Sequence, residues 1–196
     1  MIKNLIVMSL SKFSIIANFF LLLLVIGCQS DYSELVLREL ARGEKFNTLP
    51  FEMQMGAPRQ SFFDRCTQLN KEKKITQGKG GIFVEYKMFP KDSSRLADVI
   101  NLQFYGLFNE DTLCGMDMRF SYAGWSPWND IYYPEKLIKP LQDTLKKWLP
   151  GNDFIKFDIG KNKPNAWIKV DGNRQIKMYV LNDIQVAVKI EDLLQK

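Results

Sequence analysis

Short segments in which apolar and polar residues alternate are the feature that most constrains the fold of this chain. Alternation with a period of two places every second side chain on the same face of a strand, so each run predicts a strand with one apolar face. Asp171-Gly172 between two such runs is a strong signal for an antiparallel hairpin. The runs occupy 82–88, 100–104, 114–120, 155–159, 166–170, 176–180 and 184–190.

A segment with helical spacing of apolar residues precedes each group of strands. The first lies at 58–69 and the second begins near Pro134, and a proline is favoured in the first turn of a helix. Pro140 should kink the second helix or restart it. The pattern predicts an α+β protein made of two helix-plus-antiparallel-meander units, of three and four strands, with helices packed on one face of each sheet.

The N-terminus reads as a targeting segment. Lys3 and Lys12 precede a largely apolar run over 13–27, and the segment ends in Val25-Ile26-Gly27-Cys28. A basic flank, an apolar centre and a small residue before a cleavage site are the parts of a secretory signal. The alternatives are an uncleaved transmembrane anchor, because the run approaches spanning length, and an ordinary signal peptide in which Cys28 is incidental.

The residues before Cys28 resemble a bacterial lipobox, in which the chain is cut before the cysteine and the thiol is acylated. This resemblance implies lipidation, palmitate included, at Cys28 and attachment to a membrane through the N-terminal lipid. Gln29 in place of aspartate favours the outer membrane by analogy with bacterial sorting rules, and leaves open whether the protein faces the periplasm or the surface. Cleavage leaves 25 basic residues against 22 acidic ones, a weak and evenly mixed charge that argues against nucleic-acid binding.

The chain is therefore expected to comprise five parts. These are a signal peptide at 1–27, a lipidated N-terminus with a short helix and connector at 28–57, a first α+β unit at 58–121, an aromatic linker at 122–133 and a second α+β unit at 134–196.

Two cysteines of the mature chain are predicted to lie on facing apolar surfaces. Cys66 shares the apolar face of the first helix, and Cys114 alternates with Met116 and Met118 in a strand. A disulfide between them is favoured by an oxidising envelope. Two buried thiols that pack as small apolar residues are the alternative.

The linker at 122–133 concentrates aromatic residues. If exposed, they would form a platform for a glycan or a peptide; the alternative is that they fill a groove between two half-domains. The candidate ligand-binding residues are Tyr122, Trp125, Trp128, Tyr132 and Tyr133.

The sequence offers no assembled catalytic or metal-binding set. It contains no histidine, which excludes a Ser-His-Asp triad and a histidine-ligated metal. Asp171 and Asn173 are oxygen donors one residue apart, but the further carboxylates of a calcium loop are missing, so a hairpin turn is favoured. We expect no cofactor, no metal and no enzymatic activity.

The lipobox, the Trp-Ser-Pro-Trp-Asn segment at 125–129 and the Lys-Val-Asp-Gly-Asn-Arg segment at 169–174 together resemble lipoproteins of Bacteroidota. That resemblance covers most of the mature chain and implies no particular activity. Met55-Gly56-Ala57-Pro58, followed by a helix and a strand, is similar in order to the small lipoprotein of the outer-membrane β-barrel assembly machinery, although that family has the order Gly-Met.

These features predict a non-enzymatic, membrane-anchored envelope lipoprotein that binds a protein partner in outer-membrane assembly or maintenance. The alternative is a surface or periplasmic module that binds a glycan or a peptide with the aromatic linker. A third hypothesis is a hydrolase that uses two carboxylates from distant parts of the chain.

Overall fold

A computed structural model describes residues 31–78, 81–90, 95–158 and 165–195. The chain divides into two units, Met1–Arg38 and Glu39–Lys196. The lipobox and Cys28 lie outside the described residues. Helix α2 (Asp31–Ala41) crosses the boundary between the units, and acidic residues in its first turn suit the positive end of the helix dipole.

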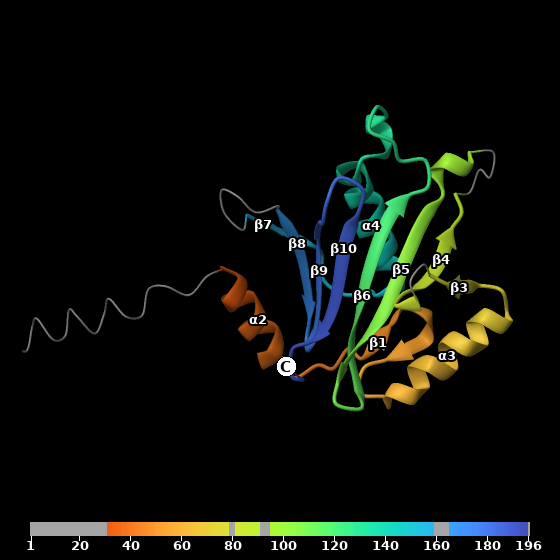
Figure 1. Cartoon of the computed structure of the whole chain (residues 1–196). Coiled ribbons are helices and arrows are strands. Elements are labelled where there is room, and N and C mark those ends of the chain that lie inside the picture. The colour runs from red at the N-terminus through yellow and green to blue at the C-terminus, as the bar shows by residue number, and fades with distance from the viewer. Residues whose placement is uncertain (1–30, 79–80, 91–94, 159–164, 196) are drawn as a thin grey trace, which may run out of the picture. The chain divides into compact units, whose positions relative to one another are not determined.

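Eight antiparallel strands of the second unit form a single sheet in the order β3-β4-β5-β6-β10-β9-β8-β7. The first four follow α3 and the last four follow α4, so each helix is succeeded by a meander (Figure 1). Strands β6 and β10, the last of each meander, pair with one another and join the two halves. The bounds of the first meander are β3 (Ile75–Gln77), β4 (Val84–Met88), β5 (Ile100–Asn109) and β6 (Thr112–Tyr122). Those of the second are β7 (Ile155–Phe157), β8 (Ala166–Asp171), β9 (Arg174–Val180) and β10 (Val186–Asp192).

The structure confirms the α+β class, and it differs from the sequence prediction in three details. The first meander has four strands, because the three-residue β3 is too short to show alternation. The two meanders share one sheet. Helix α4 (Pro134–Trp148) runs through Pro140 as one element.

Helix α4 covers one face of the sheet, over β6, β9 and β10 (Figure 1). Its buried residues, among them Leu137, Leu141 and Leu145, meet Met118 and Met178 of the strands in one hydrophobic core. All members of this core lie between Leu49 and Ile190. A chain that begins at Asp31 therefore contains the whole of the second unit, Glu39–Lys196, and every member of this core.

A two-stranded hairpin before α3 covers the same face near β4 and β5. It consists of β1 (Thr48–Leu49), the 3-10 helix η1 (Pro50–Glu52) and β2 (Met53–Gln54). Phe51 at its tip stacks on Phe104 with ring centroids 4.6 Å apart. The hairpin tip thus fills the space that α4 leaves uncovered.

Helix α3 (Arg59–Lys71) lies at the edge of the sheet, beside the start of β4 (Figure 1). Its buried Phe62 makes edge contacts with Phe104, Tyr105 and Phe108 of β5. The prediction that both helices cover a face is therefore met by α4, while α3 packs along the free edge of β5.

One strand presents its apolar residues opposite to the sequence expectation. Ile168 and Val170 alternate as predicted, but the register pairs Lys169 with Ile176 and Trp167 with Met178. The core face of β8 is therefore formed by Trp167, Lys169 and the following Asp171. The alternation was correct, and the face was wrong because the pairing register is not encoded in the strand itself.

Candidate docking surface at one end of the sheet

Several connections leave the sheet at one end, which we call the loop end. The register aligns Met88, Ile100 and Tyr122 across β4, β5 and β6, and it aligns Val180 with Val186 across β9 and β10. The β4–β5, β6–α4 and β9–β10 connections consequently leave the sheet on the same side. Figure 1 shows them at the upper end of the strands.

The described residues of the loop end expose an unusual amount of apolar surface. Trp128 is 87% exposed, Leu96 72%, and both Ile131 and Phe89 66%. Leu181 and Ile184 in the β9–β10 hairpin are also exposed. Single exposed apolar residues are common, but several on adjacent loops indicate a surface that is covered by something else.

Backbone contacts join two of these connections into one piece. The amide of Ala123 donates to the carbonyl of Val99 at 2.8 Å, and that of Gly124 donates to Ala97 at 3.0 Å. A Cβ on Gly124 would lie 2.6 Å from the Cβ of Ala97, so only glycine permits this approach. The 3-10 helix η3 (Leu96–Asp98) and the aromatic linker are thereby fixed to one another.

Two tyrosines of the linker hold it in place. The Tyr132 hydroxyl donates to the Asp98 carboxylate at 2.9 Å, and this hydrogen bond raises the pKa of Tyr132. Tyr132 also makes an edge contact with Tyr122, whose pKa is raised by burial. Both hydroxyls therefore stay protonated at neutral pH.

Of the remaining candidate residues, two are held by contacts or burial within the protein and one is exposed to solvent. Tyr133 donates its hydroxyl to the carbonyl of Pro127 at 2.6 Å. Trp125 is half-buried, and its indole nitrogen is buried without an acceptor among the described residues. Trp128 alone of the five candidates is fully presented to solvent. The structure therefore does not assemble the five rings into a common platform, and β6 and β10 of the two halves pair directly.

Sequence reasoning missed the aliphatic half of this surface. Leu96 and Ile131 stand in the 3-10 helices η3 and η4 (Asp130–Tyr132), where no periodic pattern marks them as exposed. Their significance comes only from the register, which brings the connections to the same end.

The Asp171-Gly172-Asn173 segment is a hairpin turn, as predicted, and it carries a buried charge cluster. We use this name for Lys169, Asp171 and Arg174, each at most 1% exposed. The Lys169 ammonium lies 2.6 Å from one Asp171 oxygen, and the Arg174 guanidinium lies 2.9 Å from the same oxygen. Burial lowers the pKa of Lys169.

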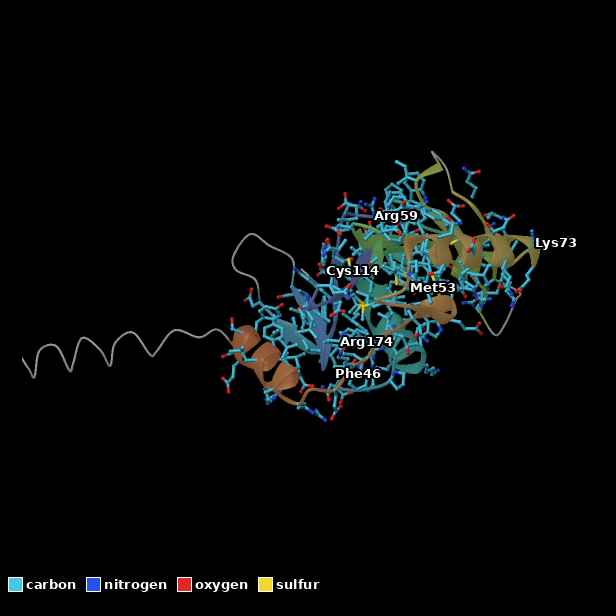
Figure 2. The ribbon with its side chains drawn as sticks, turned by 90° about the horizontal axis from the view of Figure 1, so that it is seen from below. Phe46, Met53, Arg59, Lys73, Cys114 and Arg174 are labelled. Atoms are coloured by element: carbon cyan, nitrogen blue, oxygen red, sulfur yellow. The ribbon has the colours of Figure 1, made fainter. Side chains whose placement is uncertain are left out.

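The surroundings of the charge cluster exclude calcium binding by this turn. The other Asp171 oxygen accepts from Lys169 and from the amide of Asn152, both at 2.7 Å. The Asn173 side-chain oxygen accepts from the amide of Phe46 at 2.7 Å, and Arg174 lies beside the Phe46 ring (Figure 2). Two cations already occupy the positions next to the carboxylate that a calcium ion would need. The hydrogen bonds from Phe46 and Asn152 also connect the segment before β1 and the loop after α4 to the β8–β9 hairpin.

Both described cysteines are free thiols. Cys66 faces the space between α3 and the sheet edge, and burial raises its pKa to about 11. Cys114 is the extra residue of a β-bulge: Leu107 pairs with Gly115 and Phe108 with Leu113. Leu113 is buried in the core instead, so the prediction that Cys114 faces the core with Met116 and Met118 was wrong.

Comparison with family models, curated proteins and solved structures finds no match to this chain. Among the described residues, no three acidic or cysteine side chains gather closely enough to hold a metal ion. In the same part of the chain, no helix combines the length and the apolar character needed to cross a membrane.

Proposed function

We propose that this chain is a lipid-anchored, non-enzymatic protein of a bacterial envelope that docks a protein partner through the loop end. The observation that carries the proposal is the exposure of Trp128 together with Leu96 and Ile131 on connections that are held rigidly to one another. The lipobox supports the anchoring, and Gln29 supports the outer membrane. The order of Met55-Gly56-Ala57-Pro58, a helix and a strand, which is similar to that of the small lipoprotein of the β-barrel assembly machinery, supports a partner in assembly or maintenance of that membrane.

The composition of the loop end favours a protein over a glycan as the partner. Interaction hot spots in protein interfaces are enriched in tryptophan and surrounded by contacts that exclude water. Leu96 and Ile131 offer no hydrogen bonds to the hydroxyl groups of a sugar. Of the five aromatic candidates only Trp128 is exposed, and one ring provides less stacking surface than the predicted five-ring platform would have done.

Site-specific photo-crosslinking in cells tests this function. A photoreactive phenylalanine analogue is placed at Trp128 and, as a matched control, at Glu110 in the exposed β5–β6 turn at the opposite end of the sheet. The proposal predicts one protein adduct of defined mass from position 128 and none of that mass from position 110. It also predicts that Leu96→Ser with Ile131→Ser removes the adduct from position 128.

Two results would count against the docking function. Equal adducts from positions 128 and 110 would show contact without a preferred surface. Adducts to lipid alone from position 128 would mean that the loop end meets a membrane and not a protein.

A further inference from the structure

A cavity of about 470 Å³ lies between α3, the start of β4 and the middle of β5; we call it the α3 pocket. It has a topological origin. Strand β4 pairs with β5 only as far as Phe104, and β5 continues to Asn109 without a strand on that side. Helix α3 occupies this side but cannot approach the edge as closely as a strand, so space remains. The volume is within the range of small-molecule sites.

Aromatic rings form much of the pocket wall. Phe62 of α3, Phe83 before β4 and Tyr105 of β5 line it, and the Phe62 and Tyr105 rings meet edge to face at 5.7 Å. Phe63 and Ile82 also line the pocket and are themselves exposed to solvent. A ligand in the pocket would cover these two side chains.

The wall is fixed before any ligand arrives. The amide of Gly78 donates to the carbonyl of Phe83 at 2.9 Å, and a Cβ at Gly78 would lie 2.7 Å from that oxygen. The Asn70 side chain donates to the carbonyl of Ile75 at 3.1 Å, which holds the end of α3 to β3. Arg119 stacks on the Phe83 ring at 4.5 Å. A preformed site loses less entropy on binding than one that must be ordered.

The residues that line the α3 pocket disfavour a charged ligand. Its polar side chains are neutral: Thr67, Asn70, Thr76, Gln77 and the Tyr105 hydroxyl. The thiol of Cys66 is protonated at neutral pH, since burial raises its pKa to about 11. No Lys, Arg, Asp or Glu is among the described residues that line the pocket. Among these described residues a charged ligand would find no oppositely charged side chain to offset its lost hydration.

We propose that the α3 pocket binds a neutral small molecule that contains aromatic rings. Ring faces and edges on the wall match ring-containing ligands, and the threonine and amide side chains can orient one or two neutral polar groups. The pocket is separate from the loop end, so this inference stands or falls independently of the proposed docking function.

Two fluorescent probes with the same ring skeleton test the proposal. N-phenyl-1-naphthylamine is neutral, whereas 1-anilinonaphthalene-8-sulfonate carries one negative charge on that skeleton. Titrated into the chain that begins at Asp31, the neutral probe is expected to bind saturably at one site and at least tenfold more tightly than the sulfonate. Equal binding of the two probes would overturn the proposal.

Variants locate the binding. Cys66→Phe and, independently, Thr67→Trp place bulk in the pocket and should weaken the neutral probe at least tenfold, with circular dichroism confirming that each variant is folded. Trp128→Ser at the loop end is the matched control and should bind as the wild type does. Wild-type binding by both filled variants would refute the site, and so would loss of binding in the control.

The two cysteines provide a measurement that needs no substitution. Saturation with N-phenyl-1-naphthylamine should slow the alkylation of Cys66, read by peptide mass, by at least fivefold and leave that of Cys114 unchanged. Equal protection of both thiols, or of neither, would contradict binding in the α3 pocket.

Discussion

Replacing the carboxylate of the buried charge cluster should strongly destabilise the fold. In Asp171→Asn, the side chains of Lys169 and Arg174 remain buried but lose the negative charge that lies 2.6 Å and 2.9 Å from them. The NH₂ group of the new asparagine amide would also face the Lys169 ammonium and the Arg174 guanidinium, which are themselves hydrogen-bond donors. The substitution keeps the shape of the side chain, so its effect comes from charge and hydrogen bonding.

The size of the expected loss in the free energy of unfolding follows from the burial of all three residues, each at most 1% exposed. Removing one partner of a buried ion pair typically costs about 3–5 kcal/mol, because the remaining charge is left without compensation. For a domain of this size, about 2–4 °C of melting temperature corresponds to each kcal/mol, so the melting temperature should fall by about 6–20 °C.

Urea unfolding of the chain that begins at Asp31, followed by circular dichroism, measures this loss. The matched control is Asp143→Asn, because Asp143 pairs with Lys139 on the exposed face of α4. An exposed pair of this type contributes about 0.5 kcal/mol or less. A loss below about 1 kcal/mol in Asp171→Asn would refute the reasoning that the cluster depends on its carboxylate.

Three further predictions concern backbone strain, pH and thiol chemistry. Gly151→Ala should cost more than about 2 kcal/mol in urea unfolding, because its φ is +144° and a Cβ would lie 2.2 Å from a carboxylate oxygen of the charge cluster; Gly43→Ala, where φ is +68° and nothing lies within 4 Å, should cost about 1–2 kcal/mol. The pKa of Lys169 is lowered in the fold, so between that lowered pKa and the ordinary value of 10.5 the unfolded chain binds more protons than the folded one. The contribution of Lys169 to the free energy of unfolding should therefore rise with pH in that window. Lys169→Met should remove this rise, and a pH profile unchanged by the substitution would contradict the prediction. At pH 8 the thiolate fraction of Cys66, with a pKa of about 11 in place of 9.0, should be about 100-fold below that of an ordinary thiol, so Cys66 should react slowly with a disulfide reagent in the folded protein. After unfolding, the chain that begins at Asp31 should show two reactive thiols, and fewer than two would reveal a disulfide between Cys66 and Cys114.

The elements of the fold could be predicted largely from local pattern. The alternating residues of β9 and β10 and the Asp171-Gly172 turn report directly on local backbone geometry. Pro134 stands at the start of α4 as predicted. These features depend on residues close in sequence, and that is why one sequence was sufficient to find them.

Features that depend on distant pairing could not be predicted. The joining of β6 with β10 and the side to which Ile168 points are set by register between strands, which alternation alone leaves undetermined. The bulge at Cys114 shifts the pattern by one residue and moves Leu113 into the core. Arg174 is a basic residue after a turn, and nothing in its sequence neighbours indicates that it is buried.

The candidate site was predicted only in part for the same reason. The aromatic linker was identifiable from its composition, and Trp128 is its exposed member. Leu96 comes from a connection that precedes the linker by two strands, and only the shared end of the sheet brings the two together. A docking surface built from several loops has no continuous sequence signature.

Metabolic labelling with an alkyne analogue of palmitate most directly tests the claim that this is a lipid-anchored envelope protein. In bacteria that express the full chain, the proposal predicts label on the wild type, on Cys66→Ser and on Cys114→Ser, and no label on Cys28→Ser. Loss of label in only the Cys28 variant would establish the anchor. Absence of label from the wild type, or label that persists in Cys28→Ser, would contradict the anchor and with it the proposed place of this protein in the cell.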